Sequence, residues 1–561
     1  MSTETADIDS VTLEVFRNQL ESIAEEMGEV LIQSAYSPNI KERQDCSTAL
    51  FDATGRMVAQ AEHIPVHLGA MPDAVEAVTT ADPGPGDAYI LNDPFEGGTH
   101  LPDVTIVSTI APEGTVIGYA VTRAHHADVG GMTPGSMPAG ASEIYQEGIR
   151  LPGVELRSGG ELNEDLMEVI LANVRNQTER RADLRAQLAA HDRAEERLGE
   201  LLADQGSQRV ESAFDAVIDY SRARMADEVA AFPDGTYTAT DVLEGDGVSD
   251  EDLTIEVSIT VDGQGIDVDF AGTAPQCQGN MNAPLAVAKS AVYFVVRSIT
   301  DPKIPPNHGC YAGIEVSAPP GTIVNPSPPA AVVGGNVETS QRITDVVFAA
   351  FAEAVPSRVP AHSQGTMNNL IIGTRGRGGF TYYETIAGGF GARPNKDGMD
   401  GVQVGMTNTL NTPIEALEAE YPFHVEEYAL RAGSGGDGEY RGGLGIVRSL
   451  TIETDAVVSV LTERRRHSPR GIAGGTPGAR GENRADGERL PAKATQTVDA
   501  GTTITIRTPG GGGYGNPADR DPGAIEADRL DGKVDGPDDT NEANTATERE
   551  TTDATPPEDS R

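Results

Sequence analysis

The chain has 561 residues, 38% of them hydrophobic, and a formal net charge of −45 at pH 7. This length exceeds what one ordinary hydrophobic core accommodates, so we expect a globular protein of several subdomains. The negative charge repels phosphate groups, which argues against nonspecific binding to nucleic acid or to an anionic membrane surface.

The charge balance and the cysteines indicate the environment of the chain. Asp and Glu number 87 against 42 Lys and Arg, and such an excess of carboxylates is best tolerated at high salt, where screening weakens their repulsion. An acidic protein from an ordinary cytoplasm is the alternative. Cys46, Cys277 and Cys310 form no CxxC pair, and no run approaches the roughly 18 apolar residues of a membrane span. We expect a salt-adapted, halophilic protein in the cytoplasm, with no membrane segment.

In chain order, the first predicted element is a helix over residues 11–35. Its apolar side chains recur at spacings of three and four, on one helical face: Phe16, Leu20, Ile23, Met27 and Leu31. Residues 40–131 are rich in His, Asp, Gly and Pro, and their short apolar runs predict strands joined by ordered loops. Between residues 164 and 232, Glu and Arg at helical spacings predict long charged helices whose charged face is solvated or forms an interface.

Farther along the chain, strands dominate the prediction. Residues 252–261 alternate between apolar and polar side chains, and a turn precedes a second short run at 266–270, so we predict a hairpin. The residues after Pro517 are acidic and lack aromatic side chains, which predicts a disordered tail. The expected fold class is α+β with several subdomains: a mixed N-terminal metal-binding region with a helical segment at 1–235, a central α+β region at 236–430, a β-rich region at 431–517 and the tail at 518–561.

Half of the ten histidines cluster in one stretch of the chain: His63, His67, His100, His125 and His126. In the strings NDPFEGGTHLPD and HHADVGG, imidazole and carboxylate side chains stand close in sequence. Two His and two Asp are an ordinary donor set for one divalent cation such as zinc or manganese. Asp45, in ERQDCS, is a candidate fourth ligand. Caps and turns formed by the same residue types are the alternative.

A series of longer segments extends this pattern from about residue 11 to residue 517. They include ERQDCSTALFD, HIPVHLGAMP, GDAYILNDPFEGGTHLPDVT, HHADVGGMTPGSMP, GGNVETSQRITD and MTNTLNTPIEALE. Through these segments the chain resembles the hydantoinase B and oxoprolinase family, which contains N-methylhydantoinase B type subunits and is related to the large subunits of acetone and acetophenone carboxylases. The resemblance implies an enzyme, the hydrolytic part of an ATP-dependent cyclic amidase.

The resemblance also implies a set of metal ligands. In this family the ligands are an Asp near the first motif, the His and Asp of the HLPD string, and a His of the HHADVGG string. These positions correspond to Asp45, His100, Asp103 and His125. Because neighbours on a strand point to opposite faces, only one of the two adjacent histidines is expected to bind, and we choose His125 over His126. One bound zinc or manganese ion is therefore expected.

Other polar side chains are candidates for catalysis around the metal. His126 and Asp128 are expected to manage a proton or face the substrate, with structural hydrogen bonding as the alternative. His63 is expected to border the cavity as a third catalytic candidate, whereas a structural role is the better interpretation for His67. Asp93 is a secondary candidate in the loop before the metal motif.

Three more clusters have two interpretations each. The amides and hydroxyls of residues 336–345 and 363–369 suit the orientation of a polar ring, or else form a structural network. Arg464, Arg465 and Arg466 stand out in so acidic a chain. They could meet a phosphorylated intermediate or an acidic partner, and solvated surface charge is the alternative.

Nucleotide-binding motifs are missing from the sequence. Lys289 is the only Lys followed by Ser, and Ala288 precedes it where a P-loop requires Gly. ATP is therefore expected to act through a partner, and the resemblance implies a hydantoinase A type subunit in a hetero-oligomer. That subunit would phosphorylate the amide oxygen of a small cyclic amide, and water activated by the metal of this chain would attack the activated carbon.

Two other functions compete with this prediction. The same scaffold and metal serve the large subunit of ATP-dependent ketone carboxylases of the acetone and acetophenone type, and the motifs do not separate that branch. A noncatalytic scaffold that only docks the ATP-using subunit is the second alternative. It would require the metal ligands to be absent, and they are present.

Overall fold

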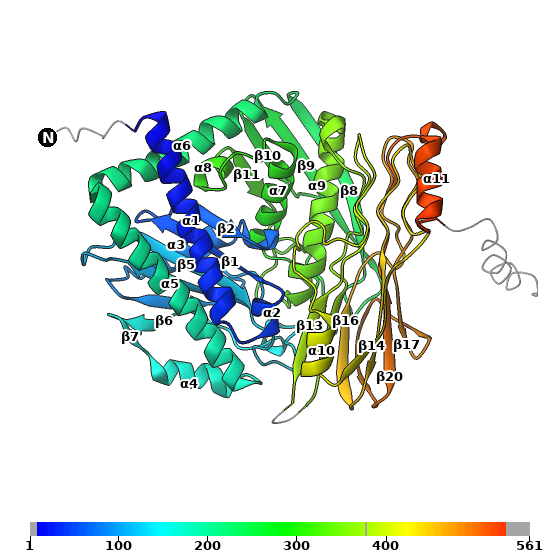
Figure 1. Cartoon of the computed structure of the whole chain (residues 1–561), viewed down its shortest axis with the longest axis horizontal. Coiled ribbons are helices and arrows are strands. Elements are labelled where there is room, and N and C mark those ends of the chain that lie inside the picture. The colour runs from blue at the N-terminus through cyan, green and yellow to red at the C-terminus, as the bar shows by residue number, and fades with distance from the viewer. Residues whose placement is uncertain (1–7, 376–378, 535–561) are drawn as a thin grey trace, which may run out of the picture.

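The structure is a computed structural model that describes residues 8–375 and 379–534, and within these residues it contains four β-sheets and their covering helices (Figure 1). The expected α+β fold class is confirmed. Figure 1 shows helices α1 and α5 lying across the N-terminal sheet, and helix α9 running between that part and the C-terminal sheets.

The N-terminal sheet has seven strands in the order β2-β1-β5-β4-β3-β6-β7, and each neighbouring pair is antiparallel. Its strands are β1 (Cys46–Asp52), β2 (Met57–Glu62), β3 (Ala88–Leu91), β4 (Asp103–Ile110), β5 (Gly118–His125), β6 (Pro152–Ser158) and β7 (Glu161–Leu162). All residues of β1, β4 and β5 are buried, which indicates that this sheet is covered on both faces.

The helices of this region include α1 (Ser10–Ser34), α2 (Pro38–Lys41), α3 (Met71–Thr79), α4 (Glu164–Ala172), α5 (Gln177–Gln205) and α6 (Ser207–Val229). The first predicted helix is confirmed as α1, and its apolar face is buried as expected. The predicted long charged helices are α5 and α6, and polar side chains on the inner face of α5 pack onto the sheet. Gln187 Nε2 donates to the carbonyl of Val104, and His191 lies between the hydroxyls of Ser108 and Thr122. Among the described helices, none is both long and apolar enough to cross a membrane.

The central sheet has the order β11-β10-β9-β8. Its strands are β8 (Gly235–Glu244), β9 (Asp252–Asp262), β10 (Gly265–Asp269) and β11 (Ile314–Ser317). The predicted hairpin is confirmed as the antiparallel pair of β9 and β10. Alternate residues of β9 enter one hydrophobic core with α7 (Leu285–Ile299) and α9 (Ser340–Ala354), while α8 (His308–Tyr311) packs against α6.

Two sheets form the C-terminal part, with the orders β13-β12-β16-β19 and β14-β15-β20-β17-β18. Their elements are β12 (Asn369–Gly373), β13 (Thr381–Thr385), α10 (Ile414–Glu420), β14 (Phe423–Leu430), β15 (Ile446–Ile452), β16 (Ala456–Leu461), β17 (Glu482–Ala485), β18 (Glu488–Leu490), β19 (Lys493–Val498) and β20 (Thr502–Arg507). Strands from both sides of the predicted boundary at residue 430 pair within each sheet. That boundary does not separate two sheets, and the boundary at residue 235 stays a prediction.

The segment after Pro517 continues as an ordered helix, α11 (Pro522–Leu530). Arg520 pairs with Asp397 at 2.8 Å and with Asp528 at 2.5 Å, and the buried Arg441 lies 3.3 Å from Asp528. The predicted disorder of residues 518–561 is therefore wrong for 518–534, since ion pairs, and not apolar burial, attach this segment. Residues 535–561 lie outside the described part.

Ending the chain after Val534 should leave its thermal unfolding unchanged, whereas ending it after Pro517 should lower the unfolding temperature. The shorter chain loses Asp528, a partner of the buried Arg441, which should cost about 1–3 kcal/mol. Asp528→Asn in the full chain is the matched control and should reproduce part of the decrease. Equal melting temperatures for both truncated chains would show that α11 does not stabilise the fold.

Candidate metal centre

Three strand ends of the N-terminal sheet meet at one edge. Asp103 begins β4 and is directly opposite His125, which ends β5. The backbone N–H of His125 donates to the carbonyl of Asp45, which directly precedes β1. Because directly opposed residues of antiparallel strands project from the same face, Asp45, Asp103 and His125 share one side of the sheet. His100 joins them from the turn before β4.

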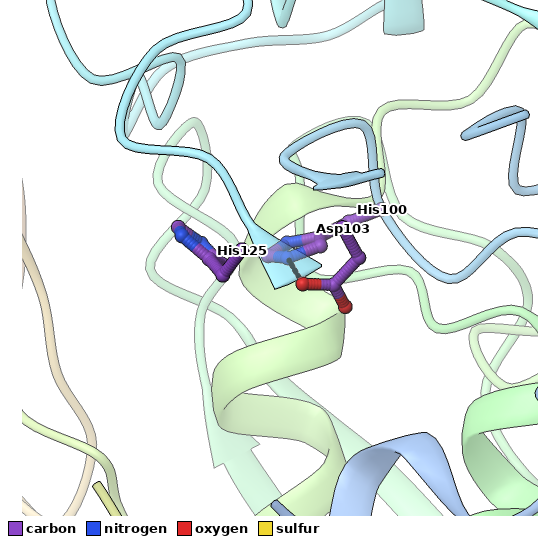
Figure 2. A group of neighbouring side chains, drawn as sticks. All are labelled: His100, Asp103 and His125. Atoms are coloured by element: carbon purple, nitrogen blue, oxygen red, sulfur yellow. Dashed lines mark ion pairs between the residues drawn. The ribbon is translucent and has the colours of Figure 1, made fainter. Parts of the chain in front are cut away.

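The side chains of His100, Asp103 and His125 form one compact buried group (Figure 2). One donor atom from each of the three lies within 4.8 Å of the other two. His100 Nε2 is 3.1 Å from Asp103 Oδ1, and the centroids of the two imidazole rings are 5.1 Å apart. Two imidazole nitrogens and a carboxylate oxygen are donors that zinc and manganese accept.

Several imidazole nitrogens at this site make no hydrogen bond of good geometry. Nε2 of His67, His100 and His125 is buried without such a bond among the described residues, although the first two lie 3.7 and 3.1 Å from the Asp103 carboxylate. Buried polar atoms are normally hydrogen-bonded, so three nitrogens around one carboxylate favour a shared cation. Burial lowers the pKa of His125 well below its ordinary value, which keeps the imidazole neutral as ligation requires. The residues fit a divalent cation.

Asp103 is held in one orientation and in its charged form. Thr99 Oγ1 donates to Asp103 Oδ2 at 2.7 Å, and Asn336 Nδ2 donates to the same oxygen at 3.3 Å. Burial opposes ionisation, yet His100 and His67 hold the pKa of Asp103 well below its ordinary value. An oriented, ionised carboxylate is the form that binds a cation.

Asp45 lies beside the group but outside the three donors that are within 4.8 Å of one another. Asn39 Nδ2 is 3.4 Å from Asp45 Oδ2 and 3.1 Å from Nδ1 of His125. Burial raises the pKa of Asp45 to about 6, with His67, Asp103, Arg43 and His100 as its charged neighbours. Its place as a fourth ligand stays a prediction.

His67, for which the sequence predicts a structural role, lies at the site. The short helix Pro65–His67 places it 3.7 Å from Asp103, measured from Nε2 to Oδ2. The hydroxyl of Ser47 lies 2.9 Å from Nδ1 of the same ring. This contact orients the imidazole so that Nε2 faces the ligand group, and it makes His67 a further candidate for ligation or proton transfer.

The wall opposite the strand ends comes from the C-terminal half of the chain. The Tyr383 ring on β13 stacks on His125 with centroids 4.7 Å apart, and its hydroxyl donates to Asn369 Oδ1 at 2.9 Å. Asn369 in turn donates to Glu338 Oε1 at 2.8 Å. Asn336 and Glu338 belong to a π-helical segment, Gly335–Thr339, that directly precedes α9. Such segments recur at functional sites.

The three predicted catalytic residues do not lie in this group. His126 is directed toward α5, where its Nε2 is 3.0 Å from Gln187 Oε1. Asp128 accepts from the N–H groups of Gly130 and Gly135 and pairs with Arg175 at 2.9 Å. His63 is half-buried, with Nε2 beside Gly28 of α1. These contacts are structural, and the catalytic roles stay untested predictions that the geometry does not support.

Asp93, the secondary candidate, is also engaged elsewhere. Its carboxylate accepts from Arg150 at 2.9 and 2.5 Å and caps the N–H of Phe95 at 3.1 Å. It therefore fixes the loop before His100 and lies outside the ligand group.

Two of the three clustered arginines are buried. Arg464 is fully buried and binds Asp241 at 2.9 Å and Asp345 at 2.6 Å. Arg465 is buried as well and donates to the side-chain oxygens of Asn368 and Asn483, while Arg466 is exposed and pairs with Asp252. Both predictions fail for Arg464 and Arg465, because their guanidinium groups are buried and bound within the protein.

A second group of possible metal ligands consists of Asp241, Asp345 and His362, all buried. Arg342 and Arg464 both bind the two carboxylates of this group. Because both arginines bind Oδ2 of Asp241 and of Asp345, the group does not offer a converging set of open donor atoms, and we assign no metal to it.

Comparison with known proteins identifies the family of this chain. A family model described as Hydantoinase B/oxoprolinase matches residues 9–517. The chain belongs to this family, which confirms the resemblance inferred from its motifs.

Relatives cover the chain almost completely, although some are much longer. An uncharacterized protein of Methanocaldococcus jannaschii is 43% identical over 537 residues, which are 94% of each chain. The 5-oxoprolinase of Dictyostelium discoideum is 38% identical and matches 91% of this chain, but the chain spans only 41% of that protein. The B-type subunit of a putative D-/L-hydantoinase from a Pseudomonas species is 32% identical over 94% of its own length and 95% of this chain.

Two solved structures share the fold. The ATP-dependent caprolactamase of Pseudomonas jessenii superposes with a TM-score of 0.89 at 29% identity, covering 94% of this chain and 95% of that one. Acetone carboxylase gives 0.83 at 20% identity, covering 93% and 78%. The second likeness concerns the fold alone.

Proposed function

We propose that the chain is the metal-dependent hydrolytic subunit of an ATP-dependent cyclic amidase. The observation that carries this proposal is the buried group of His100, Asp103 and His125, in which donor atoms of two imidazoles and one oriented carboxylate lie within 4.8 Å of one another. The names of the relatives support the reaction class, since they include a 5-oxoprolinase, a hydantoinase and a caprolactamase.

We propose Asp45, His100, Asp103 and His125 as the metal ligands, with His67 at the edge of the set. A zinc or manganese ion bound there supplies Lewis acidity, which makes water a nucleophile at neutral pH. Thr99 and Asn336 keep the Asp103 carboxylate in place, and Tyr383 covers the His125 ring.

The proposed division of labour places ATP on a second subunit. This chain has no P-loop, and it matches nearly the whole of a relative that is named as one component of a multi-subunit hydantoinase. A hydantoinase A type partner would phosphorylate the amide oxygen, and water would add to the activated carbon. The ring C–N bond would then break with the nitrogen taking a proton, and a second water would hydrolyse the remaining acyl phosphate to a carboxylate and inorganic phosphate. The reaction converts the ring C–N bond into a carboxylate and an amine on one carbon chain.

A reconstitution assay tests the proposal. The chain is purified in high salt with an A-type partner, and ATP consumption is followed with lactams, hydantoins and 5-oxoproline. Ketones with and without bicarbonate form the parallel series. We expect ATP hydrolysis coupled to ring opening, lost after metal chelation and restored by zinc or manganese. Consumption of ATP only with a ketone and bicarbonate would instead establish the carboxylase alternative.

A further inference from the structure

A cavity lies along helix α9. It has a volume of about 170 Å³ and is lined by α7, α9, the short helix Pro356–Arg358 and the loops near residues 361 and 390. None of His100, Asp103 and His125 lines it, so this cavity is separate from the metal centre. The mechanism proposed above does not use it.

The inner end of the cavity is polar and buried. Gln341, Thr344, Asp345 and His362 line it, and each is nearly inaccessible to solvent. Arg342 and Arg464 both bind Oδ2 of Asp345, at 3.2 and 2.6 Å, which leaves Oδ1 for the cavity. Burial raises the pKa of Asp345 to about 8, so a further cation near Oδ1 would favour its ionised form.

The middle of the cavity is apolar. Phe294, Phe348 and Phe390 are half-buried and form its walls, and the first two meet edge to face with centroids 6.3 Å apart. Cavities of about 150 Å³ hold a benzene-sized molecule. The space between the phenyl rings therefore accommodates a six-membered ring or a short carbon chain.

The mouth of the cavity is basic. Arg358 and Arg393 line it, and Nε of Arg393 is buried with no hydrogen-bond partner in the described residues. The Arg393 guanidinium lies over the Phe390 ring at 5.6 Å. Arg358 also pairs with Glu228 at 3.0 Å, so the unpaired Nε of Arg393 is the group that favours an anion at this end.

We propose that this cavity binds a small amino acid whose amino and carboxyl groups are separated by a short apolar chain. The ammonium group contacts Asp345 at the inner end, the carbon chain lies among the three phenylalanines, and the carboxylate lies between Arg358 and Arg393. A plain fatty acid would leave Oδ1 of Asp345 without a partner, and a plain amine would leave Nε of Arg393 without one, so each should bind more weakly.

Opening a cyclic amide gives a molecule of this class. Adding water across the ring C–N bond places hydroxyl on carbon and hydrogen on nitrogen, which leaves a carboxylate and an amine on the same chain. The identification of the ligand as the reaction product rests on the proposed function. The recognition chemistry of the cavity does not, because it follows from the lining residues alone.

Calorimetric titration of the full chain, without ATP or partner, tests the proposal. The probes are 6-aminohexanoate, hexanoate and hexylamine. We expect saturable binding of 6-aminohexanoate, and affinities at least about tenfold weaker for the two probes that lack one charged end. No saturable binding of 6-aminohexanoate up to about 10 mM, or equal affinity for all three, would overturn the proposal.

Variants locate the binding. Arg393→Gln removes a cation at the mouth and Phe348→Trp fills the cavity, and each should weaken binding of 6-aminohexanoate at least about tenfold. Arg466→Gln is the matched control, an exposed arginine paired with Asp252 on another face, and should bind like the unchanged chain. Melting temperatures establish that each variant is folded. Unchanged affinity in both cavity variants would place the ligand elsewhere and refute the assignment.

Asp103→Ala separates this site from the metal centre. It should retain 6-aminohexanoate binding, because Asp103 does not line the cavity. Loss of binding in that variant would move the ligand to the metal centre and overturn the proposal. Binding without any cyclic amidase activity in the reconstituted complex would leave the cavity assignment intact and reject only the proposed function.

Discussion

Asp103→Ala and His100→Ala should each abolish metal binding, reducing the metal content of the purified chain from about one ion to nearly none. Each change removes one of the four proposed ligands, and one of the three donors that lie within 4.8 Å of one another, which leaves the coordination shell incomplete. Elemental analysis of the purified variants measures the effect. Full metal retention in both variants would contradict the proposed ligand set.

The matched control for this prediction is His126→Ala. His126 is adjacent to His125 in sequence but contacts Gln187 on α5, so its removal should leave the metal content unchanged. His125→Ala should behave like Asp103→Ala. The reverse result for the two histidines would show that His126, and not His125, faces the cation.

The isolated chain should neither bind nor hydrolyse ATP, and it should open no cyclic amide until the partner is added. The chain lacks the Gly and Lys arrangement of a P-loop. An unstrained amide carbon is also a poor target for water without activation, which the metal centre alone does not provide. Titration calorimetry in high salt measures the first part, and product analysis measures the second.

Two results would contradict this division of labour. Stoichiometric ATP binding to the chain alone would place the nucleotide site here. Opening of a lactam without ATP would make the chain a standalone metalloamidase. ATP-dependent activity that appears only after the partner is added would support the proposal.

Local patterns predicted the regular elements well. The spacing of Phe16, Leu20 and Ile23 predicts α1, and the alternation along residues 252–261 predicts β9, because each pattern reflects one buried face. The motif strings likewise pointed to His100, Asp103 and His125. Sequence could not show that Asp103 and His125 are directly opposed, since strand register depends on tertiary pairing.

Residues whose roles depend on distant partners were harder to interpret. His67 approaches Asp103 only because Pro65–His67 folds over the strand ends, and no spacing within HIPVHLGAMP encodes that contact. Arg464 resembles surface charge in sequence, yet its partners Asp241 and Asp345 lie more than a hundred residues away along the chain. Helix α11 carries few apolar residues and is attached by ion pairs, which composition alone does not reveal.

The π-helical segment Gly335–Thr339 sets the angular relation between the candidate metal centre and the cavity along α9. An α-helix turns about 100° per residue. One extra residue in a single turn therefore rotates the preceding part of the helix by about 100° relative to the following part. Asn336 and Glu338 therefore face the metal centre, while Gln341 and Asp345 on the continuing helix face the cavity along α9. Deleting a single residue from this segment would restore ordinary helical winding. Either the side chains at the metal centre or those at the cavity would then turn away, so both sites depend on the length of the segment.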